Sequence, residues 1–179
     1  MTITEGSMLT GDYVLDTAHT RIGFVARHSM ATKVRGQFEQ YEGAVRLDGD
    51  DPARSNVALT IQAESIQTHN KQRDGQLRGN FLDARNHPVI TFTSTKVEQV
   101  GETTYEVSGD LTIRGVTKPL TMTFELIAAE NEAWGRHRVC FAGGVTINRR
   151  DWGANWNAAT GLLVKEKVIL EFDVALIRS

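Results

Sequence analysis

The sequence predicts an all-β fold in which about eight antiparallel strands close into one barrel. Apolar and polar residues alternate with a period of two through most of the chain from Asp12 to Ile177, which is typical of strands with one buried face. Turn residues separate the alternating stretches, and the strand–helix–strand rhythm of a parallel sheet is missing. Apolar faces of this length must either stack as two sheets or close on themselves.

The alternating stretches define the expected strands in chain order. They cover residues 22–28, 57–64, 90–92, 105–113, 120–128, 139–147 and 168–176. Turn signals separate them at 47–52, 100–102, 114–116 and 130–132. In the stretch 120–128 we expect every second residue from Leu120 to Ala128 to face the interior, with Thr121 and Thr123 outside.

Two segments interrupt the strand pattern. Residues 70–83 place Leu77 and Phe81 among polar residues, which predicts a short helix that covers one end of the barrel. Residues 151–163 contain two tryptophans and several small residues, and they are expected to form an irregular loop at a barrel end.

Small residues on the inward rows favour a closed barrel over a sandwich. A sandwich fills its core with interdigitating bulky side chains. The expected inward small residues are Ala26, Gly36, Ala63, Gly109 and Gly143. A barrel lined in this way can leave room for one ligand.

Length and charge limit the classes of function. The 179 residues fit one domain, which we place at 12–179 after a short extension at 1–11. Twenty basic residues stand against 22 acidic ones, so the overall charge does not favour nucleic acid as a partner. The single Cys140 cannot form an intramolecular disulfide, and its apolar neighbours predict a buried, inert thiol. No secretory signal is visible, so a cytoplasmic location is expected.

The chain resembles the YceI-like family of polyisoprenoid-binding proteins along nearly its whole length. The matching segments are 13–20 (YVLDTAHT), 22–28 (IGFVARH), 33–38 (KVRGQF), 71–78 (KQRDGQLR), 86–92 (NHPVITF), 109–120 (GDLTIRGVTKPL) and 147–153 (INRRDWG). The most distinctive of them is 109–120. Each segment alone is a weak signal, but their common order and spacing make a strong one.

The resemblance implies an eight-stranded, lipocalin-like barrel that holds a long isoprenoid chain of the quinone or polyprenyl type in its interior. It also implies a homodimer. Lys71, Arg78 and Arg85 could form a modest basic surface for transient contact with an anionic membrane, but a solvated polar face is the favoured interpretation. Neither a cofactor nor a catalytic residue is expected, and the lipid would be the ligand. Members of the family are often periplasmic, whereas this sequence begins almost directly with its first strand.

The barrel interior and its helical cover supply the candidate ligand-binding residues. They are Ile22, Phe24, Ala26, His28, Phe38, Leu59, Ile61, Arg73, Leu77, Phe81, Phe92, Leu111, Met122, Phe124, Phe141, Trp156, Leu170 and Phe172. In this set, Arg73 could meet an anionic or carbonyl headgroup and forms a charged pair with Asp74. His28 is either a hydrogen-bonded structural residue or a second headgroup contact.

Other polar motifs have structural interpretations. Asp16 and His19 could orient a headgroup or bind a metal, but a turn stabilised by the Asp16 side chain is favoured. The remaining histidines show no zinc spacing, so no metal site is expected. Residues 149–153 are interpreted as a corner in which charges pair and a ring covers the barrel rim. The segment 115–119 is a hairpin turn without the features of a phosphate loop.

Three functions remain open at this point. The first is a carrier or store for a polyisoprenoid lipid. The second is a barrel enzyme, or a stress-related binder, that takes a compact small molecule into the same cavity. The third is a partner-binding barrel with a filled core. Catalysis has little support, because no nucleophile elbow and no cofactor loop are present.

Overall fold

A computed structural model describes residues 9–27, 33–131, 137–154 and 166–179 of the protein. Their strands are β1 (Gly11–Leu15), β2 (Arg21–Arg27), β3 (Lys33–Phe38), β4 (Tyr41–Leu47), β5 (Asn56–Gln62), β6 (Ile66–Gln67), β7 (Val89–Gln99), β8 (Thr104–Ile113), β9 (Val116–Asn131), β10 (His137–Asn148) and β11 (Lys167–Arg178). The helical elements are α1 (Lys71–Gln76), the π-helical turn η4 (Leu77–Phe81), and the 3₁₀ turns η2 (Pro52–Arg54), η3 (Ala63–Ser65) and η5 (Arg149–Trp152).

The strands form one closed antiparallel barrel with eight strand positions. The sheet closes because β1 and β2 both pair with the same edge of β11, β1 at residues 176–178 and β2 at residues 168–173. In the same way β4 pairs with β1, and β3 pairs with β2. The pairs β1/β2, β3/β4 and β5/β6 are therefore interrupted long strands, each of which occupies one position. The predicted fold class is confirmed.

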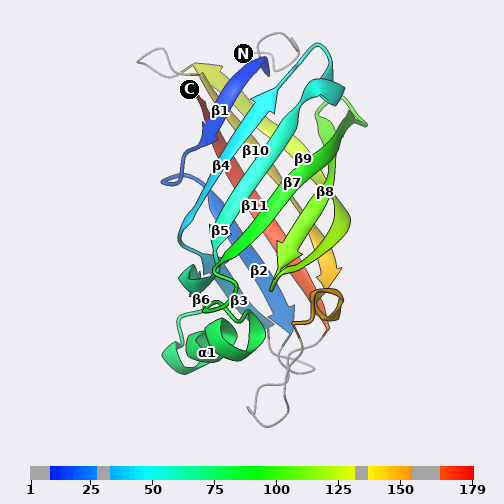
Figure 1. Ribbon diagram of the computed structural model, residues 1–179. Coiled ribbons are helices and arrows are strands. Elements are labelled where there is room, and N and C mark those ends of the chain that lie inside the picture. Colours follow the sequence, from blue (N-terminus) through cyan, green and yellow to red (C-terminus); the bar gives the residue numbers. More distant parts are fainter. Residues whose placement is uncertain (1–8, 28–32, 132–136, 155–165) are drawn as a thin grey trace.

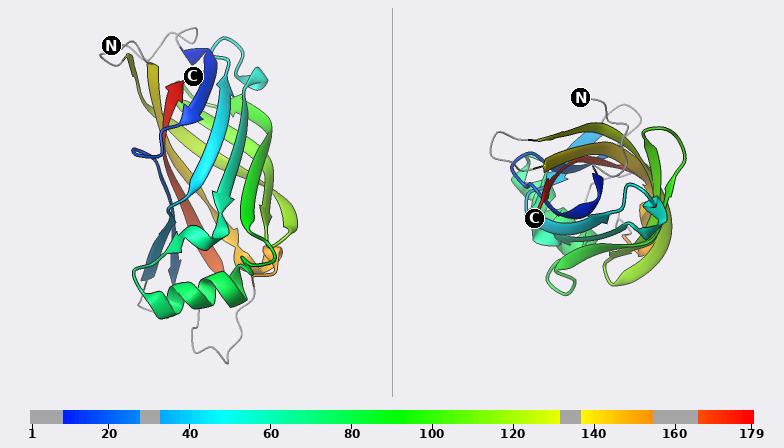
Figure 2. Two further views of the ribbon diagram at one scale, coloured as in Figure 1. Left: turned by 60° about the vertical axis from the view of Figure 1, so that its left-hand side comes forward. Right: turned by 90° about the horizontal axis from the view of Figure 1, so that it is seen from above.

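The α1–η4 segment covers one end of the barrel, and the beginning of β1 and the end of β11 lie at the other (Figures 1 and 2). The helix begins where Asn70 accepts a hydrogen bond from the backbone N–H of Arg73, at 3.0 Å, which is typical of an N-cap. It buries Leu77 against the barrel core. The short helix predicted at 70–83 is confirmed, and we call this end of the barrel the α1 end.

The break between β1 and β2 is a turn centred on Asp16. Its carboxylate accepts from the N–H of Ala18 at 3.2 Å, and lies 2.7 Å both from Nδ1 of His19 and from Nη1 of Arg138. Burial alone would raise the pKa of Asp16, but these hydrogen bonds outweigh it and the pKa lies below its ordinary value. The turn interpretation is thus supported, with Arg138 as an additional partner that the sequence does not suggest.

The hairpin between β8 and β9 turns at Arg114 and Gly115, whose φ angles are 54° and 74°. Two successive residues with positive φ are typical of a type I′ turn, which matches the twist of the paired strands. A Cβ atom on Gly115 would also lie 2.8 Å from the ring of His87. The hairpin predicted at 115–119 is therefore present, but its turn consists of Arg114 and Gly115, and residues 116–119 already belong to β9.

One predicted inward residue faces the wrong way because β9 contains a bulge. Leu126 pairs with Phe141 and Ala128 with Cys140, so Ile127 is an extra residue on β9. Ile127 is consequently 58% exposed. Beyond it the alternation shifts by one residue, and Ala129 takes the buried place that the sequence assigned to Ala128.

The thiol of Cys140 is half-buried rather than buried as expected. The neighbouring Val139 points into the core and is fully buried, so alternation puts Cys140 on the outer face of β10. Burial, as the largest effect, raises the pKa of this thiol. Little thiolate therefore forms at neutral pH.

The inward glycines do not leave open space for a ligand, which corrects the argument made from their small size. A Cβ atom on Gly36 would meet the ring of Phe24 at 2.3 Å, and one on Gly143 would meet the Phe124 ring at 2.7 Å. Gly109 is covered in the same way by Phe92, at 2.6 Å. Each glycine thus accommodates an aromatic ring from an adjacent strand.

Candidate functional site: an apolar interior with an arginine end

Two cavities lie end to end inside the barrel. One reaches α1 and η4, and we call it the α1-side cavity. The other extends toward Leu9 and the end of β11, and we call it the far cavity. Their volumes are about 100 and 110 Å³, each enough for several water-sized groups. Residues that line both cavities form a waist between them. These are Ile22, Leu59, Phe92, Met122 and Phe172.

The structure brings together nearly all the candidate ligand-binding residues. Those that line the α1-side cavity are Ile22, Phe24, Ala26, Phe38, Leu59, Ile61, Arg73, Leu77, Phe81, Phe92, Leu111, Met122, Leu170 and Phe172. Phe124 and Phe141 line the far cavity instead. His28 and Trp156 lie outside the described residues.

The sequence assigned Arg149 and Trp152 to a corner at the barrel rim, and did not predict that both line the α1-side cavity. Arg149 is only 6% exposed, and Trp152 is 3% exposed. The indole N–H of Trp152 donates to the backbone oxygen of Leu111 at 2.8 Å, which fixes the ring against the end of β8. Arg149 continues the inward period-two row of β10 two residues beyond Ile147, and this spacing is the signal that could have identified it.

Arg73 is held at the cavity by Thr68. Its Nε donates to the Thr68 hydroxyl and its Nη2 to the Thr68 backbone oxygen, both at 2.8 Å. The buried carboxylate of Asp74 accepts from the backbone N–H of Thr68 at 2.9 Å and from its hydroxyl. Thr68 therefore stands between the two charged groups, in place of the direct Arg73–Asp74 pair expected from the sequence.

Arg149 approaches the same end of the cavity from β10. Its Nη1 donates to the backbone oxygen of Ala154 at 2.7 Å, and its guanidinium lies 5.6 Å from the ring centre of Phe81 in η4. Burial first, and then the neighbouring Arg150, lower the pKa of Arg149. The wall of the α1-side cavity is thus apolar, and the guanidinium groups of Arg73 and Arg149 are held among its lining residues at the α1 end.

Neither a metal centre nor a membrane-crossing helix is found in the described part of the chain. No three His, Cys, Asp or Glu side chains come together there as metal ligands. None of the described helices has the length and apolar character to cross a membrane.

The fold and the interior define a closed eight-stranded antiparallel barrel with apolar cavities inside it. Comparison with known proteins gives the family. Residues 13–176 match the YceI-like domain, so the chain belongs to the YceI-like family. A UPF0312 protein of Pseudomonas paraeruginosa is 34% identical over 153 residues, which are 84% of this chain and 80% of the relative. One from Pectobacterium carotovorum is 36% identical over 155 residues, 85% of this chain and 80% of the relative.

Solved structures share the fold. BcnA of Burkholderia cenocepacia superposes with a TM-score of 0.79 at 24% identity, covering 92% of this chain and 99% of BcnA. A protein described as a polyisoprenoid binding domain, from Saccharophagus degradans, gives 0.72 at 20% identity, covering 93% of this chain and 98% of that domain.

Proposed function

We propose that the protein binds a long-chain polyisoprenoid lipid, of the quinone or polyprenyl type, inside the barrel and acts as its carrier or store. One observation carries the proposal: an apolar interior runs along the barrel through both cavities and ends at two held arginines, Arg73 and Arg149. Such an interior is complementary to an amphiphile with a long apolar tail and a small polar head. The binding function described for the Saccharophagus degradans domain supports the same ligand class.

In this proposal the headgroup lies at the α1 end and the tail extends through the waist into the far cavity. Guanidinium groups donate hydrogen bonds well to carbonyl, phenolate or phosphate oxygens. Hydrophobic rows such as Val168 to Leu176 on β11 continue through both cavities. They span eight residue steps, or roughly 26 Å along the strand.

The energetics of lipid transfer predict that contacts to the headgroup determine which lipid the barrel selects. Burial of about forty tail carbons from water would gain on the order of 30 kcal/mol, which exceeds the limit of non-covalent affinities. The tail instead moves between a bilayer and a barrel interior that are both apolar. The free energy of burying the tail is therefore similar in the two places and largely cancels. Contacts to the headgroup and displacement of the α1–η4 cover then set the net affinity, and exchange requires transient membrane contact.

Mass spectrometry of an organic extract of the purified protein tests this function. We expect a lipid with an isoprenoid tail, at a stoichiometry near one per binding site. A heat-treated aliquot that has been stripped of lipid and passed through the same extraction serves as the blank. Protein that contains no extractable lipid, and that takes up none from vesicles, would contradict the proposal and favour a filled core.

The waist supports a second candidate function, the binding of a compact small molecule. Because Phe92, Met122 and Phe172 separate the two cavities, a compact ligand could occupy the α1-side cavity alone. The extracted ligand distinguishes the two candidates: an isoprenoid tail of many units requires both cavities, whereas a compact molecule requires only one.

A further inference from the structure

Although the net charge of the chain is close to zero, its cationic and acidic side chains are separated along the barrel axis. At the α1 end, eleven described side chains are cationic. They are Arg27, Lys33, Lys71, Arg73, Arg78, Arg85, Arg114, Lys118, Arg149, Arg150 and Lys167. Six described carboxylates belong to this end, namely Glu64, Asp74, Asp83, Asp110, Asp151 and Glu166.

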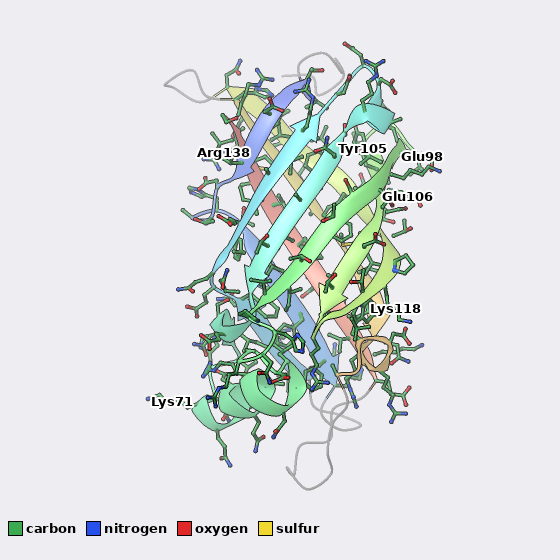
Figure 3. The ribbon with its side chains drawn as sticks, viewed as in Figure 1. Lys71, Glu98, Tyr105, Glu106, Lys118 and Arg138 are labelled. Atoms are coloured by element: carbon green, nitrogen blue, oxygen red, sulfur yellow. The ribbon has the colours of Figure 1, made fainter. Side chains whose placement is uncertain are left out.

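The opposite end has the reverse charge. Ten described carboxylates lie there, and they are Asp12, Asp16, Asp48, Asp50, Asp51, Glu98, Glu102, Glu106, Glu125 and Glu130. Five described cations accompany them, and they are Arg46, Arg54, Lys96, Arg138 and Arg178. Figure 3 shows Lys71 beside α1 and Lys118 in the half of the barrel nearer to it, with Glu98 and Glu106 in the opposite half.

Strand register gathers the cations at the α1 end. Arg27 pairs with Lys33 across β2 and β3, and Lys167 pairs with Asn148, directly before η5. The guanidinium of Arg114, at the β8–β9 turn, donates to the backbone oxygen of Gly153 at 2.7 Å. Charges from distant parts of the sequence thus meet around one end of the barrel.

The exposed side chains at the α1 end also include more cations than carboxylates. Seven of its cations are exposed, namely Arg27, Lys33, Lys71, Arg85, Lys118, Arg150 and Lys167. The exposed carboxylates described at this end are fewer, namely Glu64, Asp110, Asp151 and Glu166, and Glu166 lies 2.9 Å from the guanidinium of Arg150. The carboxylate of Asp74 is buried and accepts hydrogen bonds from Thr68. The surface at this end is therefore predominantly cationic.

A surface groove at the same end combines these cations with apolar surface. Its lining includes the cations Arg27, Lys33, Arg150 and Lys167, the single carboxylate of Glu166, and Ile169, whose exposure is 45%. Cations around an exposed aliphatic side chain are complementary to the interfacial region of a bilayer, where phosphates lie next to acyl chains.

We propose that the α1 end docks on the surface of an anionic lipid bilayer, with the barrel axis oriented by its own charge separation. Attraction of the cationic end and repulsion of the acidic end both turn the α1–η4 cover toward the lipid. The arginine end of the α1-side cavity then faces the bilayer from which the ligand comes. This inference rests on the proposed function, because the docked end is the end at which the headgroup would enter.

Vesicle flotation tests the docking surface. The probes are vesicles of phosphatidylcholine alone and vesicles of phosphatidylcholine mixed with phosphatidylglycerol. We expect the wild-type protein to float with the anionic vesicles at least tenfold more than with the neutral ones, and to lose this preference as salt shortens the Debye length from about 10 Å to about 3 Å. Equal flotation with both vesicles would overturn the proposal.

A matched pair of variants locates the surface. Lys71→Glu with Lys118→Glu reverses two exposed charges at the α1 end, and should lower anionic binding at least tenfold. Arg54→Glu with Lys96→Glu makes the same change in net charge at the acidic end, where both side chains are exposed, and should leave binding within about twofold. Equal loss in both would show that net charge, rather than the α1 end, controls binding.

Lipid extraction from the same variants separates the two proposals. None of the four substituted residues lines either cavity, so each variant should retain the extracted lipid of the wild-type protein. A wild-type protein that carries lipid but shows no preference for anionic vesicles would refute the docking surface alone. Vesicle binding without any cargo would refute the proposed function alone.

Discussion

At the scale of single residues, the aromatic rings that cover glycines organise the barrel interior. Phe24 lies over Gly36, Phe92 over Gly109, and Phe124 over Gly143. Because a glycine has no Cβ, a ring from the adjacent strand can approach the backbone there. The interior is therefore narrowed by rings at fixed positions, and these rings set the shape of both cavities.

Replacement of Gly143 by alanine tests this arrangement. The new Cβ atom would lie 2.2 Å from the backbone oxygen of Thr123, and a backbone atom cannot rotate away as a side chain can. We expect the free energy of unfolding to fall by about 1–3 kcal/mol or more, as measured by denaturant titration. The control is Gly79→Ala, where nothing lies within 4 Å of the added atom. Equal effects of the two substitutions would contradict the prediction.

Titration of His137 gives a second prediction at this scale. Burial, and then the nearby Arg178, lower its pKa from the ordinary value of 6.5. Below pH 6.5 the unfolded chain therefore takes up a proton that the folded protein resists, so stability is lost as pH falls through this region. Urea denaturation from pH 7 to pH 5 should show a steeper loss for the wild-type protein than for His137→Phe. Identical slopes would contradict this assignment.

Single residues also show what the sequence could and could not predict. Alternation places most cavity residues correctly, since the period of two is a property of the strand itself. It fails at Ala128, because a bulge leaves no mark in the apolar pattern. Arg149 could have been found by its parity, but a charged residue at the end of an apolar row resembles an ordinary strand terminus. The bridging role of Thr68 depends on tertiary contacts alone.

At the scale of elements, the α1–η4 cover combines buried anchors with a weak helix. Leu77 and Leu82 are buried in the core, while Gly75 and Gly79 lie in open space with no packing that requires glycine. Glycine in a helix costs about 1 kcal/mol relative to alanine. The π-helical hydrogen bonding of η4 is a further irregularity, of a kind often found at functional sites. This composition favours a cover that can open.

The double variant Gly75→Ala, Gly79→Ala should strengthen the cover. We expect the unfolding free energy to rise by about 0.5–1 kcal/mol per substitution, and the rate of lipid transfer between vesicles to fall. Gln72→Ala, at an exposed position in the same helix, is the control and should change neither quantity appreciably. Faster transfer in the stabilised protein would show that the cover does not limit exchange.

At the scale of the whole molecule, the symmetry of a homodimer would determine whether both of its α1 ends can dock on one bilayer. The homodimer expected from the family resemblance stays a prediction, and light scattering across a concentration series should give twice the mass of one chain, 19.8 kDa. A two-fold axis parallel to the barrel axis would present both cationic ends to one bilayer. An axis perpendicular to it would turn the two ends apart. A monomer mass at every concentration would remove the expectation.

The waist controls how far a ligand can extend through the barrel. Met122 is 4% exposed and lines both cavities, so Met122→Trp should narrow the passage between them. If a tail threads the waist, the variant will retain only ligands short enough for the α1-side cavity. Mass spectrometry of its organic extract should then show shorter tails than the wild-type extract, or no lipid. Thr121→Trp places the same ring on the outer face of β9, where Thr121 is exposed, and should keep the wild-type lipid. Tails of unchanged length in a folded Met122→Trp protein would mean that the ligand does not pass the waist, and would favour the compact-molecule alternative.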